Sequence, residues 1–345
     1  MVKNIEGGKN NKLKISIIIP CRNEEKYIAK CLDSIISQDY PIDNLEVLVV
    51  DGMSKDKTVQ VIKSYNEQPL SIKILKNPKK ITPCAFNLGI KYSKADIIMI
   101  MGAHSACERD YISKCIKYLN KYNVDNVGGI WITLPGDDTI MAQSIAITLS
   151  HPFGVGNAYF RIGSKEAKYV DTVPFGAYRR EVFNKIGLFN ERLIRNQDLD
   201  FNLRLKKAGG KILLVPDIVS YYYARSTLRA LAKNNFSNGF WVVYSTKFAK
   251  MPFSIRHLIP FFFILSVCGS MILSFIYRPF IYLFVLVFVA YLISNILFSL
   301  GISFKKGFKY FIPVILSFAT LHSSYGFGSL CGLIKLMSTR LKKLV

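Results

Sequence analysis

The sequence predicts an α/β domain built on a mostly parallel sheet, followed by C-terminal transmembrane helices. Two observations carry this prediction. Short apolar, β-branched runs alternate with helical patterns through the first 220 residues, which is typical of a parallel sheet covered on both faces. The charges are also uneven, because residues 218–345 contain 14 of the 46 basic side chains and none of the 23 acidic ones. A soluble domain without acids is unusual, whereas a membrane region with cationic edges explains the imbalance.

Four strands and four helices are predicted in the first part of the chain. The strands cover residues 15–19, 46–50, 71–75 and 97–101. The helices are expected over residues 24–37, after Ser54 as N-cap, after Thr82 as N-cap with proline next, and from the fourth strand to Lys121. In such sheets ligands bind beyond the carboxyl ends of the strands. The functional site is therefore expected in the loops that follow these four strands.

A polar set stands at those strand ends, namely Arg22, Asn23, Glu24, Asp51, Lys79, Lys80 and His104. Carboxylates suit ribose hydroxyls or the N–H edge of a base, and lysines suit a diphosphate. Ordinary loop polarity explains any one of these residues, but explains the whole set less well. No GxGxxG follows a strand and no GxxxxGK[ST] occurs, so neither a dinucleotide fingerprint nor a P-loop is present.

Three uncharged runs, at residues 258–277, 279–304 and 310–334, are each long enough to cross a bilayer. Lys and Arg before the first run and between the last two are expected to face the cytoplasm. The third run is rich in Gly and Ser, which leaves open a full crossing, a re-entrant segment or a helix packed on its neighbours. Ahead of these runs, Arg225, Arg229 and Lys233 recur every four residues after Ser226, the expected N-cap. This spacing favours a helix at the membrane surface over an ordinary solvated face.

Composition excludes several other classes of protein. The seven cysteines include no CxxC pair, which argues against a disulfide framework and a structural zinc site. The first 14 residues are polar and basic, so we expect no signal peptide and a cytoplasmic N-terminal domain. The net charge of +23 could indicate nucleic-acid binding, but the cations gather around apolar runs, which indicates a membrane and no nucleic-acid partner.

The strand-end motifs resemble those of glycosyltransferase family 2, the inverting enzymes with a GT-A fold. The resemblance is carried by ISIIIPCRNEE, LEVLVVDGMSKDKT, ITPCAFNLGIKYSKADIIMIMGAHS and the later segment from VDTVPFGAYRR to NQDLDF, and HSSYGFGSL is similar to the succinoglycan-type subgroup. It implies a polar tail (1–13), a GT-A catalytic domain (14–223) with a nucleotide half (14–105) and an acceptor half (106–223), an interfacial helix region (224–256), a membrane region (257–336) and a basic tail (337–345).

The resemblance also implies roles for individual residues. Pro20, Arg22 and Glu24 would line the nucleotide site, and Asp51 would contact the uracil or ribose. Apart from the resemblance, the charge and strand-end position of Lys79 and Lys80 suggest that they lie near the diphosphate. Asp198 falls where the family places its general base, although a first-turn helix acid is the plain structural alternative. Gln197 and Trp241 would lie on the acceptor side. Trp131, which follows two glycines, could stack on a sugar face or could equally belong to the core.

The position of the family's metal-binding DxD reads Gly102-Ala103-His104 here. The first aspartate is absent and histidine replaces the last. Mn²⁺ accepts an imidazole ligand more readily than Mg²⁺, which prefers hard oxygen donors. We therefore expect either a divalent cation, Mn²⁺ or Mg²⁺, held by His104 together with substrate phosphates, or a site in which Lys79 and Lys80 replace part of its charge.

Together these features predict a membrane-anchored inverting glycosyltransferase of the inner membrane, with its catalytic domain in the cytoplasm. The expected partners are a nucleotide-sugar donor, with UDP as the expected nucleotide, a polyprenyl-linked saccharide acceptor for cell-surface polysaccharide, and membrane lipids. One alternative is a polyprenyl-phosphate monosaccharide synthase. Another, of a different class, is a non-catalytic membrane scaffold with a degenerate metal site.

Overall fold

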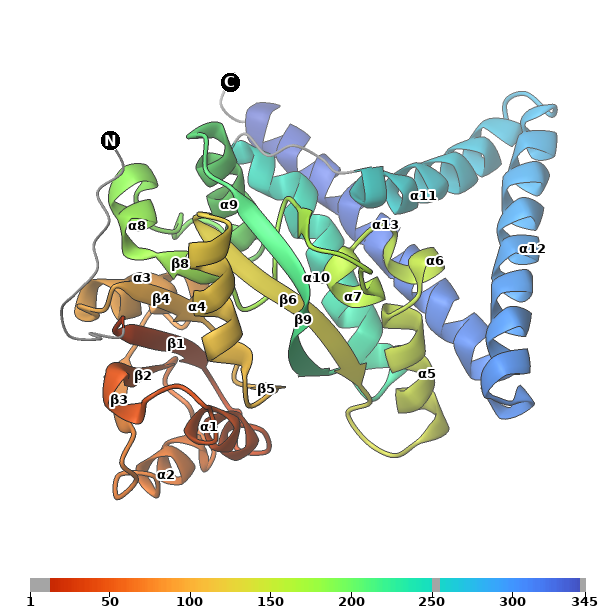
Figure 1. Cartoon of the computed structure of the whole chain (residues 1–345). Helices are drawn as coiled ribbons and strands as arrows, with labels where there is room; N and C mark the ends of the chain where they lie inside the picture. Colours follow the sequence, from red (N-terminus) through yellow and green to blue (C-terminus); the bar gives the residue numbers. More distant parts are fainter. Residues whose placement is uncertain (1–12, 250–254, 342–345) are drawn as a thin grey trace, which may run out of the picture.

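Nine strands form a single sheet in the residues that this computed structural model describes, 13–249 and 255–341 (Figure 1). The strand order is β3-β2-β1-β4-β8-β6-β9-β5, and β7 pairs with β9 beside this path. The strands are β1 (Ile15–Cys21), β2 (Leu45–Asp51), β3 (Ser71–Lys76), β4 (Ile97–Ile100), β5 (Ser105–Cys107), β6 (Asn126–Leu134), β7 (Lys168–Tyr169), β8 (Ala177–Arg179) and β9 (Ile212–Tyr223).

The first four strands match the predicted ones and are all parallel. β1 pairs with β2 and β4, and β2 pairs with β3. Most apolar side chains of β1, β2 and β4 are buried on both faces, because helices cover the sheet on both sides, whereas those of the edge strand β3 are only partly buried. One face packs against α1 (Ile28–Ile36) and α4 (Tyr111–Lys121), and the other against α3 (Thr82–Tyr92), α8 (Arg180–Ile186) and α9 (Gln197–Lys207). The carboxyl ends of the parallel strands therefore open at one edge.

The second half of the sheet is mixed, which the periodicity did not indicate. β8 runs antiparallel between β4 and β6, while β6 and β9 form a long parallel pair. β5 and β7 add short antiparallel pairings to β9. The predicted helix from residue 102 to Lys121 is wrong at its start, because β5 occupies residues 105–107 and α4 begins only at Tyr111.

Three predicted helix caps are also wrong. The hydroxyl of Ser54 accepts a hydrogen bond from the backbone N–H of Asn23, and α2 (Thr58–Lys63) begins four residues later. Ile81, in extended conformation, is the N-cap of α3, so Thr82 is its first residue. Thr227, not Ser226, caps α10 (Leu228–Tyr244), because its side chain accepts from the N–H of Ala230. Each shift moves a helix start by a few residues without changing the topology.

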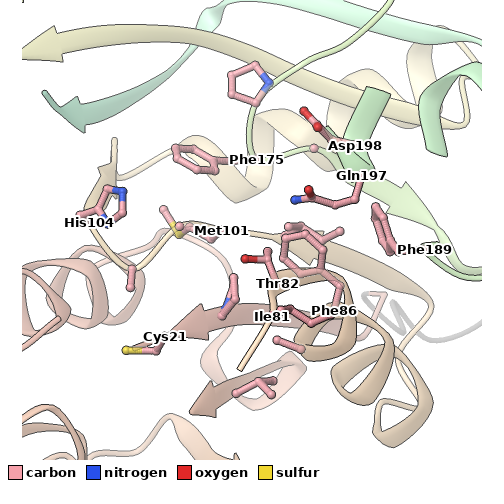
Figure 2. A pocket seen from close by; sticks show the side chains of 18 of the residues that line it. Cys21, Ile81, Thr82, Phe86, Met101, His104, Phe175, Phe189, Gln197 and Asp198 are labelled. Atoms are coloured by element: carbon pink, nitrogen blue, oxygen red, sulfur yellow. The ribbon is translucent and has the colours of Figure 1, made fainter. Parts of the chain in front are cut away.

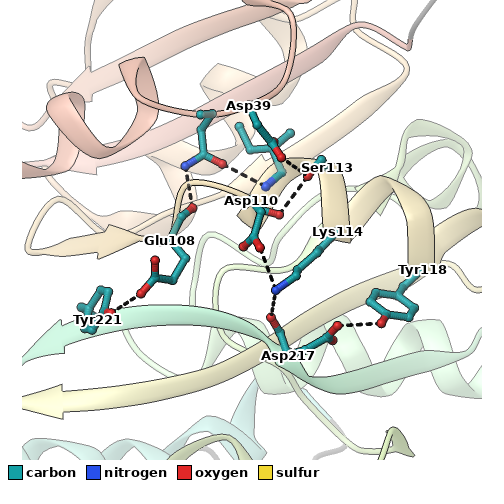
Figure 3. Close-up of polar contacts among 10 residues, drawn as sticks. Asp39, Glu108, Asp110, Ser113, Lys114, Tyr118, Asp217 and Tyr221 are labelled. Carbon is teal, nitrogen blue, oxygen red and sulfur yellow. Dashed lines mark hydrogen bonds and ion pairs between the residues drawn. The ribbon is translucent and has the colours of Figure 1, made fainter.

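A polar cluster ties the start of α4 to β9 and to the end of α1 (Figure 3). The Nζ of Lys114 lies 2.9 Å from Oδ2 of Asp110 and 2.7 Å from the carbonyl oxygen of Asp217. The hydroxyl of Tyr118 donates to Asp217 at 2.7 Å, and that of Tyr221 donates to Glu108. These bonds fasten α4 and the residue that follows β5 to β9, next to the loop that carries His104.

The C-terminal region consists of α11 (Ile255–Ser274), α12 (Phe280–Lys306) and α13 (Phe311–Leu341). Among the described residues, α11 and α12 are long and apolar enough to cross a membrane, and only 11% and 6% of their most apolar windows are buried. They are therefore unlike core helices of a soluble protein. In Figure 1, α11 leads away from the sheet and α12 stands apart from it.

The third apolar run is a different kind of helix. α13 packs along α10, and glycines allow this close approach: a Cβ at Gly239 would lie 2.0 Å from the carbonyl oxygen of Tyr325, and one at Gly328 would lie 2.1 Å from that of Phe236. Of the alternatives for this run, the helix packed on its neighbours agrees best with this geometry. Most of the polar tail (1–12) and the last four residues of the basic tail lie outside the described residues.

Candidate active site

A cavity of about 440 Å³ opens at the carboxyl ends of the parallel strands. Figure 2 shows His104 at one end, Gln197 and Asp198 at the other, and Phe175 between them. The wall combines the loops after β1, β2 and β4 with the start of α9 and with the segment before β8. The strand-end loops predicted from the sequence therefore do meet in one cavity.

Most of the predicted nucleotide-site residues lie at this cavity. Pro20, Arg22, Glu24 and Lys80 line it directly. Asp51 is buried, and its two carboxylate oxygens accept the N–H of Ser54 at 3.1 and 3.2 Å, while the neighbouring Gly52 lines the cavity. Asp51 thus holds the loop that forms the wall.

Lys79 is placed differently from Lys80. Its Nζ lies 2.6 Å from Oε2 of Glu191, and it is not among the residues that line the cavity. Hydrogen bonds from Lys79 and from Asn87 lower the pKa of Glu191 to about 2. Lys80, by contrast, is held in the left-handed region (φ 61°) and borders the cavity. Of the two lysines, therefore, only Lys80 lines the cavity.

His104 and Glu24 form the polar pair nearest to the family's metal position. Nδ1 of His104 lies 3.1 Å from Oε1 of Glu24, and both side chains line the cavity. No cluster of three or more His, Cys, Asp or Glu side chains with metal-ligand spacing occurs in the described part of the chain. The donor set fits a divalent cation with two protein ligands, one imidazole and one carboxylate, provided that substrate oxygens complete the coordination.

A side chain at residue 102 would be crowded. A Cβ built on Gly102 would lie 3.3 Å from Cε1 of Phe175. Phe175 itself has a left-handed backbone (φ 46°) and projects into the cavity between His104 and Asp198 (Figure 2). An aspartate at residue 102 would therefore compete with this ring for space, so the missing first ligand is consistent with the local packing.

Asp198 lies in the first turn of α9, directly after Gln197 and close to Asn196, whose backbone is left-handed (φ 60°). Its side chain faces the cavity, yet the surrounding protein displaces bulk water, and this desolvation raises the pKa of the carboxyl group. The N–H groups of Leu199 and Asp198 and the charge of Arg256 act in the opposite direction. A carboxyl group with a raised pKa at the wall of a cavity is suited to proton transfer.

A second cavity, of about 530 Å³, lies between the catalytic domain and the C-terminal helices. It shares Asp198, Phe160 and Thr172 with the first cavity. Its other walls come from α10, α11, α12 and α13 and from the segment around residues 149–161. Asp198 therefore stands at the junction of two cavities, one at the strand ends and one at the foot of the apolar helices.

Trp131 belongs to an aromatic and cationic stack at this junction. Its ring is parallel to that of Tyr222 at 4.7 Å between centroids, and the guanidinium carbon of Arg161 lies 4.7 Å from the Trp131 ring centroid. Trp131 lines the first cavity and Arg161 the second. Trp241 packs against Phe240 and Tyr244 and lines neither cavity.

Sequence reasoning missed three residues that the structure brings to these cavities. Phe175 and Asn196 lie inside quoted motifs, and their left-handed backbones give no signal in the sequence. Arg161 sits on a four-residue helix, α7 (Tyr159–Ile162), in a region with no recognisable pattern. Only the folded chain brings it beside Trp131, which is 30 positions earlier.

Comparison with known proteins agrees with this geometry. The family model described as "Glycosyl transferase family 2" matches residues 16–187. The chain is 35% identical to the dolichyl N-acetyl-α-D-glucosaminyl phosphate 3-β-D-2,3-diacetamido-2,3-dideoxy-β-D-glucuronosyltransferase of Methanococcus voltae. This alignment spans 336 residues and covers 94% of this chain and 98% of the relative. It is 26% identical to the succinoglycan biosynthesis protein ExoA of Rhizobium meliloti (strain 1021), over 65% of this chain and 67% of the relative.

A solved structure shares the fold. The mannosyltransferase PcManGT from Pyrobaculum calidifontis, in complex with GDP-Man and Mn²⁺, superposes with a TM-score of 0.56 at 17% identity, over 94% of this chain and 88% of that one. The fold and the site thus define a GT-A glycosyltransferase. The chain belongs to glycosyltransferase family 2, as the strand-end motifs indicated, and the scaffold alternative is set aside.

Proposed function

We propose that the protein transfers a sugar, with inversion, from a nucleoside diphosphate sugar to a lipid-linked saccharide. The sugar donor would bind in the first cavity, hereafter the donor cavity, and the saccharide acceptor would enter through the second cavity. One observation carries the proposal: Asp198 lines both cavities, so a carboxylate stands where a donor and an acceptor would meet. The Methanococcus relative, whose name describes transfer to a dolichyl-linked N-acetylglucosaminyl phosphate, supports an acceptor of this class.

The proposed reaction is a single displacement. The acceptor hydroxyl attacks the anomeric carbon, its proton passes to the carboxylate of Asp198, and the bond from that carbon to the diphosphate oxygen breaks as the nucleoside diphosphate leaves. Asp198 acts as the general base, which requires its ionised form. Burial raises the pKa of Asp198, so its ionised form is a stronger base than an ordinary carboxylate.

The leaving diphosphate needs positive charge nearby. Arg22 and Lys80 line the donor cavity and are the proposed protein cations for this purpose. A divalent cation, when bound, would supply further charge at the diphosphate, and His104 and Glu24 would hold it. The Mn²⁺ bound with GDP-Man in the PcManGT complex supports a divalent cation in this fold, and the choice between Mn²⁺ and Mg²⁺ is part of the proposal.

The proposed location is the inner membrane, with the catalytic domain in the cytoplasm. Arg256 stands in the first turn of α11, and Lys305 and Lys306 end α12. In a helical hairpin these positions share one side, and cationic ends favour the cytoplasmic side. The catalytic domain precedes α11 and would lie on that same side.

The test is transfer by the detergent-purified protein, with UDP-, GDP-, CMP- and dTDP-sugars scanned against a lipid-linked saccharide in Mn²⁺, Mg²⁺ or EDTA. We expect one nucleotide class to support transfer, with UDP the leading prediction, and the product to carry an extended saccharide with the inverted anomeric configuration. A product with one sugar on polyprenyl phosphate would instead favour the monosaccharide synthase. Retention of configuration, or no transfer from any donor, would contradict the proposal.

A further inference from the structure

The second cavity has an unusual distribution of polar groups. Three arginines line it, Arg161, Arg225 and Arg256, whereas Asp198 is the only acidic residue among its described lining residues. The helices that follow contribute apolar side chains to the same cavity, including Ile259, Phe263 and Leu321. One cavity therefore combines a cationic part near the catalytic carboxylate with an apolar part on the helices that could enter a membrane.

Arg161 is the most informative of these cations. Its guanidinium is held against the faces of Trp131 and Tyr222, at 4.7 and 5.3 Å from the ring centroids. Its Nη1 is buried and has no hydrogen-bond partner. A buried guanidinium with an unused donor is costly unless a ligand satisfies it, and planar guanidinium groups suit phosphate oxygens.

Asparagine side chains add further donors to the cavity wall. Arg195 donates to the amide oxygens of Asn234 and Asn238, at 3.1 and 2.6 Å. This leaves the amide NH₂ groups of both residues as the remaining polar ends, and both residues line the cavity. Nδ2 of Asn196, two residues before the catalytic aspartate, is buried without a partner. The unused groups here are therefore donors, as an anionic ligand requires.

The other two arginines of the cavity lie near the starts of two helices, Arg225 just before α10 and Arg256 in the first turn of α11. Arg225 is exposed to the cavity ahead of α10, and Arg256 is fixed by Asp171 at 3.1 Å in the first turn of α11. Because Asp171 offsets part of the charge of Arg256, Arg161 and Arg225 carry most of the uncompensated charge among the three arginines that line the cavity. Apolar side chains of α11 and α13 line the same cavity.

We infer that this cavity binds the phosphate ester of a polyisoprenyl-phosphate acceptor, with Arg161 and Arg225 on the phosphate, Asn196, Asn234 and Asn238 as additional donors, and the first isoprene units between α11 and α13. The inference rests on the proposed function and names the part of the acceptor that is recognised. It places the phosphate on the side of Asp198 away from the donor cavity, so that the saccharide attached to the phosphate reaches the carboxylate.

The test uses citronellyl phosphate, a ten-carbon isoprenyl phosphate, titrated calorimetrically into the full-length protein in uncharged detergent. The variants Arg161→Met and Arg225→Gln are compared with Arg229→Gln, an exposed cation of α10 that does not line the cavity. We expect the first two to weaken binding at least tenfold each, as for a lost charge-assisted hydrogen bond, and the third to bind like the wild type. Arg225→Gln changes an exposed residue, so the test does not depend on the stability of Arg161→Met.

A second readout locates the ligand. In a Trp241→Phe background the emission of Trp131 should change on binding, because Arg161 touches its ring. Inorganic phosphate and dihexanoyl phosphatidylglycerol should bind at least tenfold more weakly than citronellyl phosphate. Equal binding of the phosphatidylglycerol would assign the cavity to bulk lipid and overturn the inference, as would equal binding by all three variants or no binding by the wild type.

Nucleotide binding is measured on the same samples. If the nucleotide binds but citronellyl phosphate does not, the acceptor inference fails while the proposed transferase function stands. If citronellyl phosphate binds as expected but no nucleotide does and no sugar is transferred, the phosphate site stands and the proposed function fails. The two claims can therefore fail separately.

Discussion

Nδ1 of His104 lies 3.1 Å from Oε1 of Glu24, at the end of the donor cavity opposite Asp198. The two residues belong to the loops after β4 and β1, which become neighbours because β1 and β4 are paired in the sheet. Residue 102 is glycine and residue 104 is this histidine, so the carboxylate beside His104 comes from the loop after β1 and not from residue 102. If the pair holds a metal as proposed, one imidazole and one carboxylate would favour Mn²⁺ over Mg²⁺.

The metal prediction concerns His104→Ala and His104→Asp. Loss of the imidazole should weaken Mn²⁺ binding roughly ten- to a hundredfold, since one of the two proposed protein ligands is removed. The aspartate variant should bind Mg²⁺ better than the wild type, because it restores a hard oxygen donor. Metal titrations of transfer activity, with EDTA as the zero point, measure both effects. Identical Mn²⁺ dependence in wild type and His104→Ala would remove His104 from the metal site.

Adjacent lysines provide a matched pair for the donor cavity. Lys80→Ala should lower the affinity for the nucleoside diphosphate roughly three- to tenfold. The loss is modest because the Lys80 side chain is exposed. Lys79→Ala should leave this affinity nearly unchanged, because Lys79 pairs with Glu191 outside the cavity lining. Equilibrium binding of the preferred nucleoside diphosphate to both variants decides the matter. The reverse order of effects would show that the diphosphate lies on the Glu191 side.

The raised pKa of Asp198 predicts a pH-dependent effect on stability. A carboxyl group whose pKa is higher in the folded than in the unfolded state loses stabilisation as pH rises through the folded value. Asp198→Asn should therefore raise the unfolding temperature at pH 7, and this gain should vanish as pH falls toward the unfolded carboxyl value of about 3.9. Thermal unfolding in detergent at several pH values measures this. A destabilised Asn variant at pH 7 would contradict the burial argument.

Glycine contacts between α10 and α13 should be sensitive to a single methyl group. Gly239→Ala would bring its Cβ to 2.0 Å from the carbonyl oxygen of Tyr325, so the helices must separate, at a cost of about 1–3 kcal/mol. Gly269→Ala in α11 is the control, since no heavy atom lies within 4 Å of its Cβ position. Thermal unfolding of both variants provides the comparison. Equal stability would mean that the two helices do not meet as described.

The parallel half of the fold could be predicted closely because its strands are short, continuous apolar runs bounded by polar loops. β1 and β2 begin within a residue of the predicted positions. The antiparallel insertion of β8, only three residues long, has no such pattern, since its place depends on pairing with β4 and β6. Predictions of helix starts were wrong for a related reason. Ser54 is a residue type that often caps helices, but its hydroxyl accepts a hydrogen bond from the N–H of Asn23 in another loop.

The donor cavity was predictable in outline because strand ends of a parallel sheet converge by geometry. Its fine structure was not, since the sequence does not distinguish Lys79 from Lys80 or show that Trp241 packs away from both cavities. The second cavity could not be predicted at all. It is enclosed by segments from residue 149 to residue 325, and Arg161 becomes informative only through its position against Trp131 and Tyr222.

The most direct test of the account is turnover by Asp198→Asn beside nucleotide and citronellyl phosphate binding by the same protein. Removal of the base should lower the transfer rate roughly 10²- to 10⁴-fold while both affinities stay within a few fold of the wild type. Asp138→Asn, an exposed turn residue, serves as the control and should transfer at the normal rate. Wild-type turnover by Asp198→Asn would contradict the assignment of the carboxylate that joins the two cavities.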